Sequence, residues 1–220
     1  MNKPLNSEIC GVILTRNKVA AHMAVTEMVE VGVRDILVLA PAGILGDVVY
    51  RVQELEHRLG CRLTYRAMLK TCEGAEPLCA AENFVGCRHV AVSLEPVGDP
   101  AIVCAYKRAL GLFRRQGEGA VVVLRRHMAA VRQEGKYAYW PPGVSLEVGS
   151  MRGGKVVDFI LVYGPESASV HSPRVMPFAM YDAELWDVLA RMIHSNRGII
   201  EWRDVHQAYL DEAQMGAVMV

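Results

Sequence analysis

The sequence has no excess of charge of either sign, because 24 Lys and Arg residues balance 24 Asp and Glu residues in a chain of 220. A neutral chain produces no long-range field toward polyanions, so we expect no nucleic-acid partner. Long hydrophobic runs are also missing. The longest charge-free apolar stretches fall short of the roughly 18 residues that a membrane span needs, so we expect no membrane partner.

Patterns typical of metal and disulfide sites are absent from the sequence. The six cysteines are irregularly spaced without a CxxC pair, and the seven histidines contain no HExxH pair. Met1 to Ser7 also lack the apolar core of a secretory signal peptide. We therefore expect a cytoplasmic protein with reduced thiols.

Hydrophobic residues make up 52% of the chain and follow two alternating patterns. Apolar runs predict buried strands at Ile9–Leu14, Asp35–Ala40, Val90–Leu94 and Ala120–Leu124, and a further strand is expected at Arg62–Leu69. Amphipathic segments between them predict helices at Lys18–Val31, Ile44–Leu59, Leu78–Phe84 and Ile102–Arg115. Strands that are apolar on both sides need helices on both faces, so the pattern predicts a three-layer α/β fold with a mainly parallel central sheet.

The pattern changes after Leu124. Strand-like runs separated by Gly and Pro turns predict a small antiparallel addition at one edge of the sheet, with strands at Tyr137–Trp140, Val144–Val148 and Val156–Val162. Two further helices are expected at Glu184–Ile193 and Arg203–Met215. No repeat or linker interrupts the chain, so we expect a single domain over residues 1–220.

The last residues, Ala213–Val220, carry no charge. Exposed, they would form an apolar patch of the kind that marks a contact site, which predicts a homo-oligomer or pairing with a related chain. Burial of the same residues within the monomer is the alternative.

The loop after the first predicted strand is the leading candidate for ligand binding. Thr15, Arg16 and Lys18 lie there at the carboxyl end of a parallel strand and at a helix N-terminus, where α/β folds bind anions. We expect these residues to hold a phosphate group. Plain solvation of a tight turn by two cations is the alternative interpretation.

Asp99 follows the predicted strand Val90–Leu94, where a carboxylate is placed to hold a hard cation such as Mg²⁺. An Asp between Gly and Pro is equally typical of a turn. Other familiar motifs are incomplete. Pro41–Gly46 lacks the GxGxxG spacing of a dinucleotide site, and Gly143–Glu147 lacks the second glycine of a GxSxG elbow, so a dinucleotide-dependent enzyme and a serine nucleophile are both disfavoured.

Taken in order, several segments resemble the bacterial UTP-glucose-1-phosphate uridylyltransferases, a family of sugar-phosphate nucleotidylyltransferases. The resemblance runs from about Ile9 to Val220 and rests on Ala24–Leu39, Gly74–Gly86, Val90–Pro96, Gly135–Tyr137, Gly154–Asp158, Glu184–Leu189 and Gly198–Val205. It implies a Rossmann-like nucleotidyltransferase fold. It also implies a ligand site at Thr15, Arg16, Lys18 and Gly74, and metal ligands at Asp99 and Asp204.

The sequence departs from the family at its catalytic motifs. Only the eight residues Thr15–His22 stand where the family has its glycine-rich triphosphate loop. The family's base-reading Gln falls at Ala67, and its His falls at Ala75. These losses remove groups that would stabilise charge on a transferring phosphoryl group.

Later motifs depart as well. The family's metal-binding Asp falls near Pro96, which leaves Glu95 and Asp99 as the nearby carboxylates. The lysine that holds the sugar phosphate has no counterpart in Leu161–Pro165, and the sugar-loop Gly aligns with Pro177, which has no N–H to donate.

Together these departures predict a protein that has kept the fold and lost the catalysis, acting as a ligand-binding or partner subunit for a nucleotide or sugar phosphate. The alternative is an active nucleotidylyltransferase that forms a nucleoside-diphosphate sugar, such as UDP-glucose, from a nucleoside triphosphate and a sugar 1-phosphate. The alternative would require Mg²⁺; the leading interpretation requires no cofactor.

Overall fold

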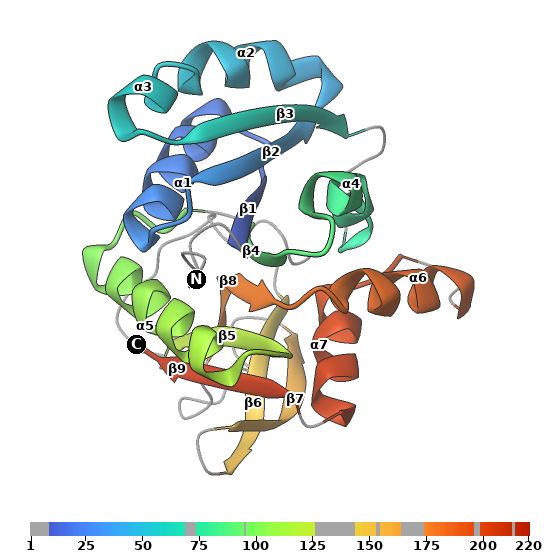
Figure 1. Ribbon diagram of the computed structural model, residues 1–220. Coiled ribbons are helices and arrows are strands. Elements are labelled where there is room, and N and C mark those ends of the chain that lie inside the picture. Colours follow the sequence, from blue (N-terminus) through green and yellow to red (C-terminus); the bar gives the residue numbers. More distant parts are fainter. Residues whose placement is uncertain are drawn as a thin grey trace, which may run out of the picture.

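The computed structural model describes residues 9–68, 74–94, 96–125, 144–152, 155–163, 174–195, 199–212 and 214–220. Within them, strands pair into one sheet with the order β3-β2-β1-β4-β8-β5-β9-β7-β6 (Figure 1). The strands are β1 Ile9–Leu14, β2 Asp35–Pro41, β3 Arg62–Met68, β4 His89–Ser93, β5 Ala120–Arg125, β6 Val144–Arg152, β7 Lys155–Tyr163, β8 Arg174–Tyr181 and β9 Met215–Met219.

The helices follow the order that the sequence predicts. They are α1 Lys18–Val31, α2 Ala42–Val52, α3 Leu55–Leu59, the 3₁₀ helix η2 Glu76–Ala81, α4 Glu82–Val85, α5 Pro100–Gln116, α6 Leu185–Ser195 and α7 Trp202–Asp211. The expected helix at Ile44–Leu59 is divided into α2 and α3. The break is local, because Gln53 and Glu54 between them keep right-handed helical backbone angles.

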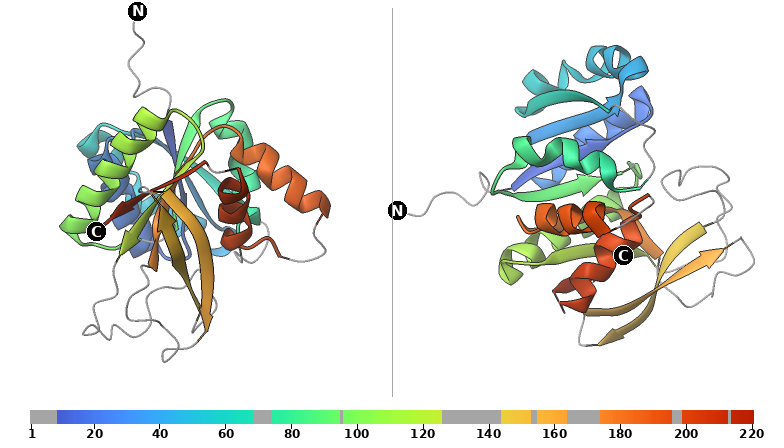
Figure 2. Two further views of the ribbon diagram at one scale, coloured as in Figure 1. Left: turned by 90° about the horizontal axis from the view of Figure 1, so that it is seen from below. Right: turned by 90° about the vertical axis from the view of Figure 1, so that its right-hand side faces the viewer.

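The sheet is parallel over its first four strands. β1 pairs in parallel with β2 on one side and β4 on the other, and β3 pairs in parallel with β2. β8 lies antiparallel between β4 and β5, while β9 is parallel to β5. β6 and β7 form an antiparallel pair at the far edge, as Figure 2 shows. The predicted three-layer α/β fold with an antiparallel addition is therefore confirmed.

Helices cover both faces of this sheet. The α1/α5 layer comprises α1, α2, α3 and α5, and the α6/α7 layer comprises η2, α4, α6 and α7 (Figures 1 and 2). Side chains of β1 alternate between the layers: Ile9 and Ile13 pack in the α1/α5 core, and Val12 and Leu14 in the opposite core. Burial on both faces explains why the strands read as unbroken apolar runs.

The C-terminal part differs most from the expectation. The helix predicted over Arg203–Met215 ends at Asp211, and Met215 begins β9. β9 lies between β5 and β7, with Met215 and Gly216 buried. The proposed exposed patch at Ala213–Val220 is therefore wrong for residues 214–220, which the sheet absorbs as an internal strand.

β8 was not predicted, because Pro177 interrupts its pattern. Proline cannot donate a ladder hydrogen bond and is rare inside sheets. The structure accommodates it at an irregularity, where the β5–β8 register shifts between Val122 and Leu124. The carbonyl of Pro177 still accepts a hydrogen bond from the Leu94 N–H, at 2.9 Å.

Some expectations fall on residues outside the described part. They concern the strand Tyr137–Trp140, the turn Gly135–Tyr137 and Glu95. The five cysteines that the structure describes are free thiols. Among the described residues, no helix is both long and apolar enough to cross a membrane.

Candidate functional site

The loop between β1 and α1 is held by its own side chains. Thr15 is buried, and its hydroxyl donates a hydrogen bond to the Asn17 carbonyl at 2.8 Å. Asn17 is the N-cap of α1, where its side-chain oxygen accepts from the N–H groups of Val19 and Ala20, at 2.7 and 3.4 Å. Two backbone donors that would otherwise bind an anion are thus already satisfied within the loop.

The two cations of this loop are on its surface. Lys18 begins α1, and its ammonium group lies 3.3 Å from a carboxylate oxygen of Asp47 on α2. Arg16 is exposed, one residue after Thr15. An anion at this loop would therefore be held mainly by Arg16. It would also bind Lys18, but only by displacing the Asp47 carboxylate from that side chain.

Gly74 serves close packing. Its φ of +69° and the position of the Ile200 carbonyl leave no room for a Cβ atom. The next residue, Ala75, donates its N–H to the same carbonyl at 2.7 Å. Gly74 therefore joins the segment before η2 to the segment before α7, a contact that substitution by any larger residue would disturb.

Asp99 is the N-cap of α5. Its Oδ1 accepts a hydrogen bond from the Ala101 N–H at 2.9 Å, and its Oδ2 lies 4.0 Å from Arg125 at the end of β5. The preceding loop is anchored by Glu27 of α1, whose Oε1 accepts from the N–H groups of Val97 and Gly98 at 3.0 and 2.6 Å. Burial raises the pKa of Glu27. The contacts of Asp99 thus agree with the interpretation that it is a turn residue and not a metal ligand, because its side chain caps the helix that follows the turn.

Asp204 belongs to a capping box at the start of α7. Its side chain accepts a hydrogen bond from the Glu201 N–H at 3.0 Å, while the Glu201 side chain accepts from the backbone of Asp204. Such a pair stabilises a helix start without any ligand. Among the described residues, no group of three or more His, Cys, Asp or Glu side chains is placed to hold a metal ion.

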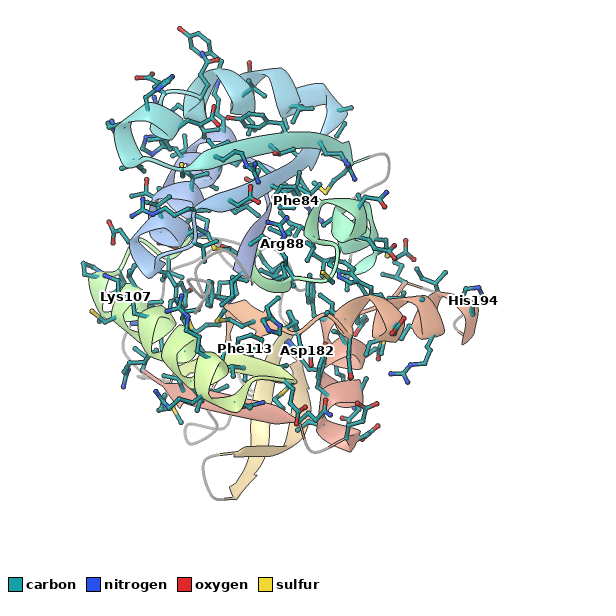
Figure 3. All side chains as sticks on the ribbon, in the orientation of Figure 1. Phe84, Arg88, Lys107, Phe113, Asp182 and His194 are labelled. Atoms are coloured by element: carbon teal, nitrogen blue, oxygen red, sulfur yellow. The ribbon has the colours of Figure 1, made fainter. Side chains whose placement is uncertain are left out.

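A buried polar network, which the sequence did not reveal, lies in the α6/α7 layer. Asp182 follows β8 and accepts hydrogen bonds from the N–H groups of Gly119 and Glu184 and from the Tyr209 hydroxyl. Figure 3 shows Asp182 between β8 and the helices of this layer. Burial is the main cause that raises the pKa of Tyr209, with the neighbouring Asp182 adding to it. The network joins the beginning of β5 to α6 and α7.

A second buried pair lies nearer the start of α7. Tyr181 Oη is 2.7 Å from His206 Nε2, and burial lowers the pKa of His206 to about 4. The imidazole is therefore neutral at pH 7. His206 follows Trp202 by four residues, a spacing that puts both on one helical face. That spacing is the sequence signal from which the burial of His206 could have been predicted.

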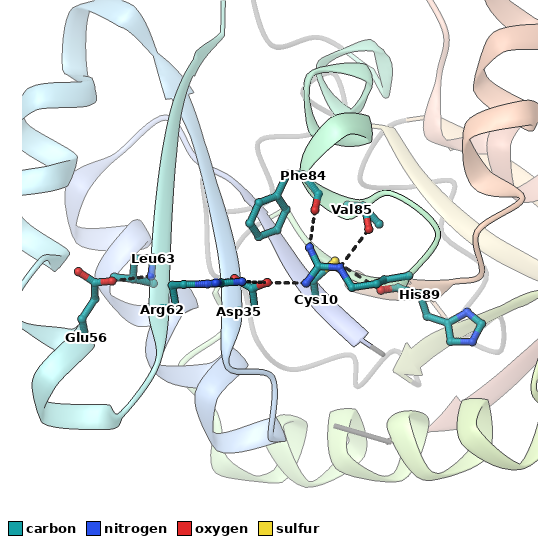
Figure 4. Close-up of polar contacts among 9 residues, drawn as sticks. Cys10, Asp35, Glu56, Arg62, Leu63, Phe84, Val85 and His89 are labelled. Atoms are coloured by element: carbon teal, nitrogen blue, oxygen red, sulfur yellow. Dashed lines mark hydrogen bonds and ion pairs between the residues drawn. The ribbon is translucent and has the colours of Figure 1, made fainter. Parts of the chain in front are cut away.

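A charged cluster of a different kind lies at the amino ends of β2 and β3. Asp35 begins β2 and binds the guanidinium groups of Arg62 and Arg88 (Figure 4). Arg88 also donates to the carbonyls of Phe84 and Val85. Because the surrounding carbonyls and Asp35 use its donors, this cluster ties β2, β3 and α4 together at the amino ends of the strands, away from the candidate ligand residues.

No protein-family model and no curated protein matches the sequence. Solved structures do match the fold. A structure described as a glucose-1-phosphate thymidylyltransferase from Bacillus anthracis, in complex with sucrose, matches with a TM-score of 0.71 at 20% identity, over 96% of this chain and 87% of that chain.

Two structures of UDP-glucose pyrophosphorylase are also similar. The complex with UDP-glucose gives a TM-score of 0.66 and the apo form 0.64, each at 12% identity over 96% of this chain and 90% of theirs. The chain therefore has the fold of the sugar-phosphate nucleotidylyltransferases. At this level of identity the likeness establishes the fold, and the chemistry has to be argued from the residues.

Proposed function

We propose that this protein binds a phosphate-bearing ligand, a nucleotide or a sugar phosphate, at the carboxyl edge of its sheet without catalysing nucleotidyl transfer. One observation carries the proposal. Most polar side chains that the resemblance assigns to ligand or metal binding already have partners within this chain's own fold, as helix caps, loop hydrogen bonds or a surface ion pair; they are Thr15, Lys18, Asp99 and Asp204.

The two candidate metal ligands illustrate this point. Asp99 caps α5 and faces Arg125, and Asp204 closes the capping box of α7. Mg²⁺ prefers several oxygen ligands in near-octahedral geometry, and these two carboxylates are each already committed to a backbone N–H. The donor set does not fit a divalent cation, so we derive no metal-dependent step.

The binding half of the proposal rests on the cations of the β1–α1 loop. Asn17 caps the N–H groups of Val19 and Ala20 at the start of α1, so attraction of an anion falls mainly to the side chains of Arg16 and Lys18. Lys18 must exchange its ion pair with Asp47, a pair whose side chains are 55% and 67% exposed and which therefore contributes little. A phosphate dianion is a stronger partner for both cations.

The test combines a catalytic assay with calorimetric titration. Purified protein incubated with UTP, glucose 1-phosphate and Mg²⁺ should release no more pyrophosphate than a heat-inactivated control. Titration with UTP, UDP-glucose and glucose 1-phosphate should show binding of at least one of them. Binding should weaken about tenfold in the Arg16→Ala/Lys18→Ala variant, which loses two charge-assisted contacts.

A matched variant controls for net charge. Lys107→Ala/Arg115→Ala removes two exposed cations of α5, and Figure 3 shows Lys107 on the outer side of that helix. It should bind as wild type does. An equal loss of affinity in both variants would show that the ligand is attracted by positive charge in general and not by a specific site. Pyrophosphate release well above the control would replace this proposal with the active nucleotidylyltransferase.

A regulatory or partner-subunit role would follow from binding without catalysis. We keep self-association, or pairing with a related chain, as part of the proposal. Light scattering after size exclusion tests it, since a 24.3 kDa species at micromolar concentration would argue against the homo-oligomer.

A further inference from the structure

The helix α5 carries positive charge only. Its 17 residues include four cations and no Asp or Glu, and all four cations are exposed. They form the cationic face, which comprises Lys107, Arg108, Arg114 and Arg115. These residues are two adjacent pairs seven positions apart, so they share one side of the helix. Within the described part of the chain, Lys107 and Arg115 have no carboxylate partner.

The segment that contains α6 and α7 carries the opposite charge. Between residues 184 and 212, six acidic residues outnumber three arginines. The six form the acidic face, which comprises Glu184, Asp187, Glu201, Asp204, Asp211 and Glu212. Glu212 pairs with Arg191 at 3.5 Å and thereby joins the end of α7 to α6. Asp187 lies one helical turn before Arg191, and Asp211 directly precedes Glu212, so both carboxylates lie beside this junction.

The two charged faces lie on opposite sides of the molecule. Figures 1 and 2 place α5 on one side of the sheet and α6 and α7 on the other. Figure 3 shows Lys107 on the outer side of α5 and His194 at the distant end of α6. The chain as a whole is neutral, so two copies do not repel each other through net charge. A positive face of one copy can therefore approach a negative face of another.

Both faces also offer apolar surface next to their charges. Ile193, near the end of α6, and Ile199, just before α7, are 48% and 52% exposed. On the other side of the molecule, Arg108 donates a hydrogen bond to the carbonyl of Met219, so β9 borders the cationic face. Val218 and Val220 at this end of the chain are only half-buried. A partner that docks on either face could bury apolar atoms as well as pair charges.

We propose that the cationic face of one copy of this chain binds the acidic face of a second copy. The second copy is the partner because each chain carries the complement of its own charged face. Since the two faces lie on opposite sides of the molecule, the contact is head-to-tail, and repetition of it builds rings or open chains instead of a two-fold dimer. This inference rests on the self-association that is part of the proposed function, and it adds the surfaces and the geometry of that contact.

Sedimentation of the full chain, without any ligand, is the first test. At low salt the mass should rise with protein concentration beyond twice 24.3 kDa. The association constant should fall at least about tenfold when NaCl is raised from about 20 mM to about 500 mM, because salt screens charges on exposed surfaces. A mass that stays at 24.3 kDa, one that stops at a dimer, or association that salt does not weaken would overturn the proposal.

Two charge-reversed variants locate the contact. Lys107→Glu/Arg115→Glu alters the cationic face, and Asp187→Lys/Asp211→Lys alters the acidic face. Each variant alone should remain monomeric at low salt. An equimolar mixture should associate again, because each variant keeps the face that the other has lost. Recovery in the mixture would also show that both variants are folded. Association of either variant alone, or failure of the mixture to associate, would contradict the head-to-tail contact.

Two further variants serve as controls. Arg51→Glu/Arg58→Glu reverses two exposed cations of α2 and α3, outside both faces, and should associate as wild type does. Loss of association in this variant would show that net charge alone governs it and would overturn the proposal. The Arg16→Ala/Lys18→Ala variant should also associate as wild type does. Failure of ligand binding and failure of this contact are therefore distinguishable.

Discussion

The two helical layers bury different chemistry against the same sheet. The α1/α5 layer packs aliphatic and aromatic side chains, and Glu27 is its buried charged residue among those described. The α6/α7 layer instead buries Asp182, which accepts a hydrogen bond from Tyr209, and His206, which lies within hydrogen-bond distance of Tyr181. One core is therefore almost entirely apolar, while the other contains a hydrogen-bonded polar network.

The buried titratable groups of the two layers respond to acid in opposite directions. Burial raises the pKa of Glu27, which favours the protonated form, so acidification relieves the cost of burying its charge. Burial lowers the pKa of His206 to about 4, so the folded state resists the proton that the unfolded state accepts near its ordinary value of 6.5. Acid between pH 6.5 and 4 therefore reduces the stability that His206 contributes in the α6/α7 layer.

The largest effect is expected from a cavity in the apolar layer. Phe113 of α5 is 1% exposed and packs edge-on against His89, with ring centroids 5.1 Å apart. Phe113→Ala should lower the free energy of unfolding by about 4 kcal/mol. Urea unfolding measures this loss, with the exposed Lys107→Ala on the same helix as the control. A loss below about 1 kcal/mol would show that this layer is not tightly packed.

Removal of the Asp182 carboxylate from the α6/α7 layer should lower the free energy of unfolding by nearly as much. Asp182→Ala leaves the N–H groups of Gly119 and Glu184 and the Tyr209 hydroxyl without their acceptor. We expect a loss of about 3 kcal/mol in the free energy of unfolding, because buried unsatisfied donors are expensive. The exposed Asp187→Ala on α6 is the matched control. Similar unfolding curves for the two variants would contradict a structural role for the network.

A pH titration sharpens the comparison. Because the folded-state pKa of His206 lies below its unfolded value, its contribution is complete above pH 6.5 and is lost as the pH falls toward 4. Unfolding free energies measured between pH 7 and 4 should therefore decrease by about 3 kcal/mol from this group. His206→Gln should flatten that part of the profile, whereas the exposed His194→Gln should not. An unchanged profile in His206→Gln would refute the assignment.

The smallest effect is expected at the amino edge of the sheet, outside both cores. Arg62 binds Asp35 through two hydrogen bonds, but its side chain is 72% exposed. Arg62→Ala should change stability by about 0.5 kcal/mol, and less at high salt. Thermal melting at two salt concentrations checks it. A loss above about 2 kcal/mol would mean that the cluster contributes more to the stability of the fold than its exposure indicates.

Local patterns sufficed for the first half of the fold. The run at Ile9–Leu14 and the amphipathic segment at Lys18–Val31 match β1 and α1 residue for residue, and Gly32 ends α1 with a φ of 105°. β8 and β9 were missed because their strand character comes from distant partners. Pro177 is tolerated because the pairing of β8 with β5 is irregular at that point. Met215 is part of a strand because β9 lies between β5 and β7 in the sheet.

The candidate site was less predictable than the fold. Sequence position correctly put Thr15 at a strand end and Asp99 in the turn after β4, yet it left open whether these groups serve a ligand or the backbone. The capping of α1 by Asn17 depends on side-chain geometry that spacing does not specify. The network around Asp182 depends on residues from three segments, before β5, before α6 and within α7, so no local motif indicates it.

The place of β8 has a consequence for the order of folding. β4 and β5 are linked by α5 alone, yet they lie on opposite sides of a strand that the chain supplies only from residue 174 onward. The β3-β2-β1-β4 half makes short-range pairings and should form first, whereas β5 must wait for a long loop to close. During that interval the free edge of β4 is an open template, so a chain arrested before residue 174 should be prone to aggregation.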